Sequence, residues 1–435
     1  MRFKFKSLTE AREYLESSGV IDHQVGVLRR VEMVKCPAQF PPLKLCTGFP
    51  TVPEDGQPEL GSGIGFSNID AYMAAVVEGL ERNLPRDYMR HHIVSGRYED
   101  FGGKAVDPNH FLPYADEQYT DKFYCKKYSH DLKLTWIDAW SMKDRCFKKV
   151  PAQVAGFAYE FHKNGEPFLL EQITTGFAGH LDPYAVLASS LQEVVERHST
   201  MTTWYSKGET HLVDCSELFQ SDANWARMKR YIDDHEIDVK VVYLPNVFKI
   251  PMTVCFAFNK NRDFFKPYAV GASARPSLWD SAKKSLLEMF QTMVYFSKLT
   301  GDFPKAVRKK FASPVDVVQP MEHPAYYAEL GQYDSFSWIW RDAKSSISLK
   351  PSVAGIDVGS DIVGHFLQKV KDTGRDWLVI DFTPNSYRRL GFRFVRSVLS
   401  HFVPMNGMHS LQGYRFVDKL GHSHEFLNNN PHPFP

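Results

Sequence analysis

A glycine and a glutamate recur at a fixed interval three times along this chain. The pairs are Gly61 and Glu78, Gly176 and Glu193, and Gly271 and Glu288, and each interval is 17 residues. A small residue follows each glycine by two positions and another by 14, and apolar residues surround the acid. This pattern predicts a strand, a glycine turn and a helix that carries the acid. The chain therefore contains three copies of one unit, named here the first, second and third repeats.

Each repeat carries a second polar side chain close to its acid. The three sequences are Glu78-Gly79-Leu80-Glu81-Arg82, Glu193-Val194-Val195-Glu196-Arg197 and Glu288-Met289-Phe290-Gln291. Residues three apart share one face of a helix. Apolar neighbours leave these helices little polar surface, so we expect the acids to be buried or to line a cleft.

Clustered carboxylates in such a setting narrow the choice of ligand. Buried like charges are costly unless a cation compensates them. Oxygen ligands without clustered histidine or cysteine favour a hard ion, Mg²⁺ above all. Mg²⁺ beside glycine turns at helix N-termini indicates a nucleotide phosphate. The sequence therefore favours a shared magnesium–nucleotide site, and the alternative is a structural repeat with buried ion pairs to Arg82 and Arg197.

The composition argues against several classes of protein. A chain of 435 residues with 43% hydrophobic residues can form two or three domains with large cores. The formal charge of +1 gives no sign of a nucleic-acid or anionic-membrane partner. No apolar run reaches the roughly 18 residues of a membrane span, and the basic residues 1–6 are not followed by the apolar region of a secretion signal. The six scattered cysteines resemble reduced cytosolic thiols, so we expect a cytoplasmic protein.

Hydrophobic periodicity places the other elements. Helices are expected at residues 7–18, from the N-cap Ser67 to about 86, at 183–204 and at 362–370. Strands are expected at 25–34, 132–140, 239–244, 254–258, 376–383 and 390–396. The proline-rich stretch 36–60 is expected to form loop or edge strand, and 95–128 a long surface loop that covers a site.

Taken together, the three repeats resemble the YcaO family of ATP-dependent enzymes, which modify peptide backbone amides. The first repeat is similar to the family's G-K-G-x-[ST] turn followed by E-x-x-E-R. The second is similar to S-x-G-x-A followed by E-x-x-E-R and a tryptophan, here Trp204, and the third to G-x followed by E-x-x-Q. Residues 136–151 resemble its W-x-x-G-x-S … V-P segment, and 381–396 its D-x-T … L-G-x-x-V-R segment. The resemblance covers about residues 20–410.

Four positions depart from the family pattern. Ile64 stands where the first turn has a lysine, so a phosphate contact expected there is missing or is supplied elsewhere. Thr174 replaces a serine and keeps a hydroxyl. His198 and Ala139 stand where aspartate and glycine are usual. None of the four changes removes a carboxylate of the expected metal site.

The resemblance implies an α/β (α+β) fold of the YcaO type with ATP and Mg²⁺ as cofactors. It implies an N-terminal segment (1–60) packed on an ATP-binding catalytic domain (61–415), and a C-terminal tail (416–435). The implied metal ligands are Glu78, Glu81, Glu193, Glu196 and Glu288. The implied nucleotide contacts are Ser67, Arg82, Thr174, Arg197 and Gln291, and Arg396 is implied in phosphate binding or catalysis.

The chain ends in Pro431-His432-Pro433-Phe434-Pro435. Composition alone favours a disordered, extended end. Azoline-forming YcaO enzymes are similar in ending with P-x-P-x-P. The resemblance thus implies a cyclodehydratase that converts Cys, Ser or Thr of a ribosomal precursor peptide to thiazoline or (methyl)oxazoline rings, as in bacteriocin biosynthesis. ATP would phosphorylate the amide oxygen, and the carboxylate of Pro435 would accept the proton released on cyclisation.

The resemblance also implies partners, because it uses nearly the whole chain and leaves no evident segment to grip a leader peptide. A separate leader-binding protein of the ubiquitin-activating-enzyme-like type is expected, with a homodimeric state and, where azolines are oxidised, a flavin-dependent dehydrogenase. Two alternatives stay open. One is a YcaO enzyme that forms thioamides with a TfuA-like partner. The other is a non-catalytic ATP-binding scaffold, which Ile64 favours and the retained acids oppose.

Overall fold

The computed structural model describes residues 5–35, 40–51, 59–157, 159–259, 268–298, 311–417 and 427–434. They belong to two compact units. The first comprises residues 1–112, 116–194 and 370–401, and the second comprises 113–115, 195–369 and 402–435. Helices α4 (Pro183–Ser206) and α11 (Ile362–Asp372) contribute to both units. Among the helices of the described ranges, none is both long and apolar enough to cross a bilayer.

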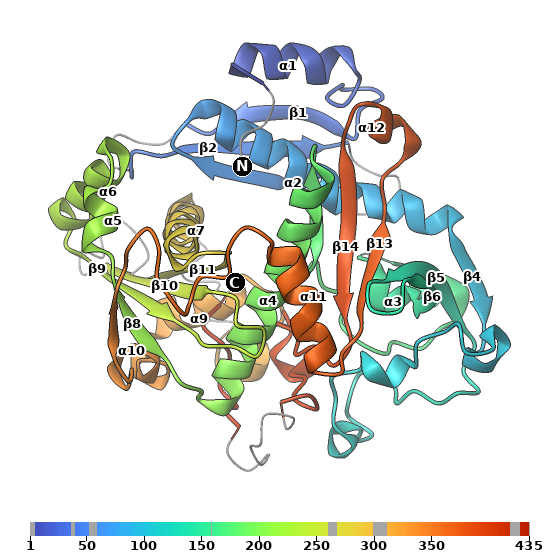
Figure 1. Ribbon diagram of the computed structural model, residues 1–435. Helices are drawn as coiled ribbons and strands as arrows, with labels where there is room; N and C mark the ends of the chain where they lie inside the picture. The colour runs from blue at the N-terminus through green and yellow to red at the C-terminus, as the bar shows by residue number, and fades with distance from the viewer. Residues whose placement is uncertain are drawn as a thin grey trace. The chain divides into compact units, whose positions relative to one another are not determined.

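In the first unit a three-stranded antiparallel sheet packs against a long helix (Figure 1). The strands are β1 (Leu28–Met33), β2 (Lys44–Pro50) and β3 (Gly61–Gly65), in that order. Helix α2 (Asn68–His91) contacts all three strands, and α1 (Leu8–Ser17) packs on α2. The helix expected at 7–18 and the strand expected at 25–34 are confirmed. The proline-rich stretch differs from expectation, because it supplies β2, the central strand.

A second, antiparallel sheet belongs to the same unit. Its strand order is β4 (Ile93–Gly96), β5 (Leu134–Ser141), β13 (Trp377–Asp381), β14 (Arg393–Leu399) and β7 (Phe177–His180), and β6 (Cys146–Pro151) pairs with β5. The connections include α3 (Ala152–Ala155), α12 (Asn385–Arg389) and short 3₁₀ helices at 98–101, 108–110, 116–118 and 161–164. Strands from the middle and the end of the chain therefore meet in one sheet.

The segment predicted as a surface loop, residues 95–128, has little regular structure, as expected, but is not a surface feature throughout. Leu112 and Tyr128 are buried in one apolar cluster with Trp136 of β5. The Trp136 indole N–H also donates to the carbonyl of Gly96 at 2.8 Å. A large indole fixed in this way draws the flanking irregular chain into the core.

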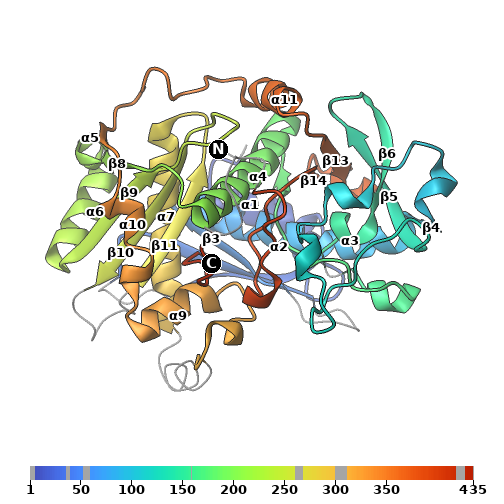
Figure 2. The ribbon, with the colours of Figure 1, turned by 90° about the horizontal axis from the view of Figure 1, so that it is seen from below.

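The second unit is built on a five-stranded sheet. Its order is β11 (Tyr268–Ala274), β10 (Met252–Asn259), β9 (Ile237–Tyr243), β8 (His211–Asp214) and β12 (Ser346–Ser348), and only β12 and β8 run parallel. Helix α7 (Leu278–Lys298) lies along β10 and β11 (Figure 2). The other helices are α5 (Ser216–Gln220), α6 (Ala223–Asp234), α9 (Glu322–Leu330) and α10 (Trp338–Arg341), with 3₁₀ turns at 314–316, 333–335 and 409–411. The strands expected at 239–244 and 254–258 are confirmed as β9 and β10.

The glycines of the repeats lie in or next to strands rather than in turns. Gly61 belongs to β3 and Gly271 to β11, while Gly176, at φ +85°, directly precedes β7. A Cβ atom at Gly61 would lie 2.2 Å from the Ala75 carbonyl oxygen, and one at Gly271 would lie 2.4 Å from that of Ser285. In the first and third repeats the strand and helix backbones therefore touch, and the small residue 14 positions after the glycine forms part of the contact, whereas Gly176 of the second repeat lies against the backbone of Ser397 in β14. In the first and third repeats the recurring interval reflects this close strand–helix packing.

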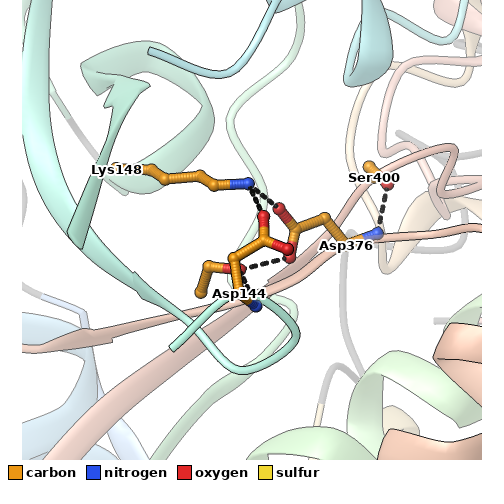
Figure 3. Close-up of polar contacts among 5 residues, drawn as sticks. Asp144, Lys148, Asp376 and Ser400 are labelled. Carbon is orange, nitrogen blue, oxygen red and sulfur yellow. Dashed lines mark hydrogen bonds and ion pairs between the residues drawn. The ribbon is translucent and has the colours of Figure 1, made fainter. Parts of the chain in front are cut away.

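The segment similar to W-x-x-G-x-S forms a polar network that fastens the large sheet of the first unit (Figure 3). Lys148 contacts the carboxylates of Asp144 and Asp376, the latter at 2.9 Å. The hydroxyl of Ser141 donates to Asp376 at 2.8 Å, and the Asp376 N–H donates to Ser400 Oγ at 2.8 Å. The network joins the β5–β6 turn to the start of β13 and to the end of β14, which is a structural role.

Candidate active site

Glu78 lies in the middle of α2 and is held from two directions. Its carboxylate accepts hydrogen bonds from the N–H and the hydroxyl of Ser62 in β3, at 2.7 and 3.1 Å. The Arg82 guanidinium lies 2.6 Å from the Glu78 carboxylate and 3.8 Å from the Glu59 carboxylate. Glu78, more than any other group, raises the pKa of Arg82. The first repeat thus fixes a carboxylate and a charged arginine on one helix face.

Glu81 lies one turn further along α2 and is buried. Its carboxylate accepts a hydrogen bond from the N–H of Gly179 in β7. Burial, and next the charge of Glu78, raise the pKa of Glu81 well above its ordinary value, with Glu193 adding to the rise. A nearby cation would stabilise the charged carboxylate and so lower the pKa of Glu81. The shift therefore marks a place where added positive charge is stabilising.

Glu193 of the second repeat repeats the arrangement of Glu78. Its carboxylate accepts a hydrogen bond from the N–H of Gly176 at 3.1 Å. The neighbouring Ser190 hydroxyl donates to the Gly176 carbonyl at 2.5 Å and accepts from the Ser397 N–H at 2.8 Å. In both repeats an acid on the helix is bound by a backbone N–H at or beside the repeat glycine. The interval between glycine and acid thus sets the position of the carboxylate.

Arg396, on β14, is buried and is engaged by backbone. Its two terminal nitrogens donate to the carbonyls of Gly156 and Ile173 at 3.0 and 2.8 Å, and its guanidinium lies 4.6 Å from the ring centre of Phe177. Burial lowers the pKa of Arg396 to about 9, an effect that the charge of Glu193 opposes. The third nitrogen, Nε, is buried and has no hydrogen-bond partner among the described residues. Arg396 therefore fixes the segment before β7, and its predicted part in catalysis stays a prediction.

The remaining predicted acids belong to the second unit. Glu196 is 6% exposed, and the Arg197 Nε lies 3.6 Å from its carboxylate. A terminal nitrogen of Arg197 contacts the Met405 sulfur at 2.8 Å. On α7, Glu288 pairs with Lys284 at 3.0 Å, and Gln291 follows it by three residues. A joint site that combines these side chains with the acids of the first unit stays a prediction.

Three positions of the expected phosphate-binding turns have local roles. The hydroxyl of Ser67 caps α2 by accepting from the Asp70 N–H at 3.2 Å. The carbonyl of Thr174 accepts from the Phe177 N–H at 3.2 Å. Ile64 is buried within β3 and pairs with Leu45. A lysine at position 64 would therefore start from a buried position of the sheet.

The acids suit Mg²⁺ that is bound together with phosphate, not a cage made by protein alone. Within the described ranges, no group of three or more His, Cys, Asp or Glu side chains is arranged to hold a metal ion by itself. Mg²⁺ usually takes one or two carboxylates, and waters and substrate phosphates complete its shell. Glu81 fits this need, because its buried charge is poorly compensated.

The end of the chain packs into the second unit. Residues 431–434 are buried, and His432 and Phe434 are only 1% and 2% exposed. The disorder that composition favours is therefore wrong for the described tail, residues 427–434. Pro435, the predicted proton acceptor, lies outside the described residues, as do residues 418–426.

Comparison with known families decides the classification. The sequence model of the YcaO cyclodehydratase family, described as ATP- and Mg²⁺-binding, matches residues 62–403. The chain belongs to the YcaO cyclodehydratase family. ATP and Mg²⁺ are therefore its cofactors, as predicted. A comparison of the sequence with curated proteins found no match.

Solved structures share the fold. A heterocyclase in complex with substrate and cofactor matches at a TM-score of 0.75 and 15% identity, over 97% of this chain and 57% of that one. YcaO from Methanopyrus kandleri, bound with AMPPCP and Mg²⁺, matches at 0.59 and 16% identity, over 93% and 91% of the two chains. The E. coli microcin synthetase McbBCD complex matches at 0.61 and 15% identity, over 93% and 96%. The predicted α/β fold of the YcaO type is confirmed, and the chain spans just over half the length of the first heterocyclase.

Sequence reasoning missed the groups that hold the acids and the tail. The backbone N–H groups of Ser62, Gly176 and Gly179 bind carboxylates, and no side-chain pattern marks a backbone donor. His323 and Tyr327 contact the tail from α9. Their spacing of four residues puts them on one helix face, which is a signal that the sequence offered.

Proposed function

We propose that this chain catalyses the ATP-dependent cyclodehydration of Cys, Ser or Thr residues in a ribosomally made precursor peptide, giving thiazoline or (methyl)oxazoline rings. The family supports ATP- and Mg²⁺-dependent chemistry. The observation that carries the ring-forming assignment is the P-x-P-x-P end, which is buried against its own chain up to Phe434. A disordered tail with no docking contacts would have argued against it.

Ring formation is proposed to proceed in three steps. The substrate thiol or hydroxyl loses its proton and attacks the preceding amide carbon, so that a carbon–sulfur or carbon–oxygen bond forms and the carbonyl electrons move to oxygen. That oxygen takes the γ-phosphoryl group of ATP, which leaves as ADP. The amide nitrogen then loses its proton, the carbon–nitrogen double bond forms, and the oxygen departs within inorganic phosphate. Each ring costs one ATP and removes one water.

We propose that the acids of the repeats bind Mg²⁺ together with the ATP phosphates. The metal-binding set is Glu78, Glu81, Glu193, Glu196 and Glu288, and the nucleotide-binding set is Ser67, Arg82, Thr174, Arg197 and Gln291. The support in the first unit is electrostatic, because Glu78 and Glu193 both raise the pKa of Glu81. Mg²⁺ supplies the positive charge that lets such acids stay ionised together, and it offsets charge that develops on phosphate oxygen.

The carboxylate of Pro435 is the proposed proton acceptor for ring closure. Proline fixes φ near −65°, so a P-x-P-x-P strand loses little entropy when it docks. A short tether to the buried Phe434 limits where that carboxylate can reach. General-base help of this kind contributes about 10²–10⁴ in rate.

The proposal includes partner proteins. The E. coli microcin synthetase that shares the fold is a complex, McbBCD, and has also been seen with pro-MccB17 bound. By analogy we propose that a separate protein binds the leader of the precursor peptide, that this chain acts as a dimer, and that a flavin-dependent dehydrogenase acts afterwards where azoles are made.

Mass spectrometry of a candidate precursor, co-expressed with this chain and the products of neighbouring genes, tests the function. The expected product is lighter by one water per ring, and a Glu81→Gln variant should leave the precursor unmodified. A product of higher mass would identify a thioamide-forming enzyme, and an unmodified precursor with bound ATP would support a scaffold. Heavy oxygen placed in the reacting carbonyl should appear in phosphate, and its release into water alone would refute amide phosphorylation.

A further inference from the structure

The tail cannot satisfy its backbone carbonyls with hydrogen bonds among its own residues. An extended proline-rich strand makes no internal hydrogen bonds, and proline has no N–H to donate. The carbonyls of such a strand must therefore find donors elsewhere when it is buried. Residues 431–434 are all buried, so each carbonyl that they bury needs a partner from the body of the protein.

Four consecutive carbonyls of the tail each meet a side-chain donor. Trp204 Nε1 and Gln412 Nε2 donate to the carbonyl of Asn430, at 3.3 and 3.2 Å. The hydroxyl of Tyr327 donates to the carbonyl of Pro431, and that of Tyr268 to the carbonyl of Pro433 at 2.9 Å. Between them, Nδ1 of His323 lies 3.1 Å from the carbonyl oxygen of His432. The donors therefore follow the tail residue by residue.

The last three donors come from two rigid elements of the second unit. His323 and Tyr327 lie one turn apart on α9, and Tyr268 is the first residue of β11. Burial raises the pKa of both tyrosine hydroxyls, so they remain protonated donors. The ring of His323 also stacks on that of His432, with centroids 3.6 Å apart and planes within 3°. Hydrogen bonds and stacking together hold the tail in this docked position.

We propose that Tyr268, His323 and Tyr327 are positioning residues, a carbonyl clamp that fixes the end of the chain for ring formation. The proposal rests on the proposed function, because the clamp acts through the tail and not on substrate. A clamp that holds three carbonyls in succession fixes both the depth and the direction of the strand. It thereby sets the reach of the residue that follows Phe434.

The clamp requires the proton of the His323 ring to be on one particular nitrogen. Its second ring nitrogen, Nε2, lies 3.0 Å from the carbonyl oxygen of Gly407. A neutral imidazole carries one N–H and so donates to only one of the two carbonyls. The proposal requires the proton on Nδ1, which faces the tail. Asparagine places an amide N–H near the position of Nδ1, and glutamine places one near that of Nε2, so the two variants separate the contacts.

The tyrosine experiment compares Tyr268→Phe, Tyr327→Phe and the control Tyr326→Phe. Tyr326 is the neighbour of Tyr327 on α9, and within the described ranges its hydroxyl forms no hydrogen bond to the tail. Hydrogen exchange of the C-terminal peptide should become about 5- to 10-fold faster in each clamp variant, because one buried hydrogen bond is lost. Ring formation should slow while ATP affinity is unchanged, and the control should match the parent. Unchanged exchange in both clamp variants, or equal effects in the control, would overturn the clamp.

The histidine experiment covers the case in which a tyrosine variant is poorly folded. His323→Asn should retain more ring formation and slower tail exchange than His323→Gln, and the opposite order would overturn the assignment of the Nδ1 proton to the tail. A protein extended beyond Pro435 separates this proposal from the proposed function. If the extended protein loses ring formation but the faster-exchanging clamp variants keep it, the clamp is refuted. If the extended protein also forms rings fully, the catalytic role of the tail has failed and the clamp's role in ring formation fails with it.

Discussion

Acidification should release the tail, because its histidine is docked without a proton. His432 is 1% exposed, and burial lowers its pKa to about 3. Three further basic groups face it: Arg197 from α4, His409 from the 3₁₀ turn at 409–411, and His323 from α9. Each of these opposes a proton on His432. The free tail has no such surroundings, so its histidine should titrate near the ordinary value of 6.5.

The sign and size of the effect follow from proton linkage. Below pH 6.5 the free tail binds a proton that the docked tail does not, so docking weakens as the pH falls towards 3 and is insensitive to pH above about 7. For pKa values of 6.5 and about 3, the docking equilibrium falls roughly 25-fold between pH 7 and pH 5, or about 1.9 kcal/mol. Burial also lowers the pKa of His323, so its protonation at low pH weakens docking as well.

Hydrogen exchange of residues 427–434, with the intrinsic pH dependence of exchange removed, measures this equilibrium. His432→Gln keeps an N–H for the Asn406 carbonyl, which His432 Nε2 meets at 3.0 Å, but does not titrate. It should lose most of the pH dependence, whereas the exposed His162→Gln control should keep it. A parent protein whose docking is the same at pH 7 and pH 5, or a His432→Gln variant with the full effect, would refute the reasoning.

Three further predictions concern the repeats. Glu193→Gln and Glu196→Gln should abolish turnover and weaken Mg–ATP binding with little change in melting temperature, whereas a fall in stability of several kcal/mol with unchanged ATP affinity would favour structural ion pairs. Gly271→Ala should destabilise the protein by about 2 kcal/mol or more in denaturant unfolding, because the new Cβ would lie 2.2 Å from the backbone nitrogen of Met289. Ile64→Lys should cost roughly 1–3 kcal/mol without raising ATP affinity in titration calorimetry, and a gain in affinity would show that the side chain reaches phosphate.

The repeats could be predicted from the sequence because their constraint is local. A glycine against a helix backbone admits no Cβ, and a helix has a fixed rise per residue, so Gly61 and Glu78 keep their interval. The same pattern did not tell a turn from a strand. The sequence predicts a turn at Gly61–Gly65 because glycine is rare within strands, but packing against Ala75 overrides that preference.

The rest depends on contacts between distant parts of the chain. The pairing of β13 with β5 and of β14 with β7 has no signature in the local sequence. The sequence predicts β5, β13 and β14 as strands, but it places β7 in the glycine turn of the second repeat. The tail shows the same limit. Its prolines indicate an extended strand, but only the positions of Tyr268 and His323, far away in sequence, decide that it is buried. The candidate acids were found by residue type, and the backbone groups that bind them were not.

The contact between strand glycine and helix also limits how the length of this protein can vary. A single residue inserted within α7, between Leu278 and Glu288, would turn everything beyond it by about 100° about the helix axis and advance it by about 1.5 Å. The acid would then leave its face, or the small residue at Ser285 would leave the glycine. Insertions and deletions should therefore be rejected within the helical part of each repeat. For insertional mutagenesis or the grafting of a reporter peptide, the helical stretches 68–78, 183–193 and 278–288 are closed to changes of length, even where their individual residues accept substitution.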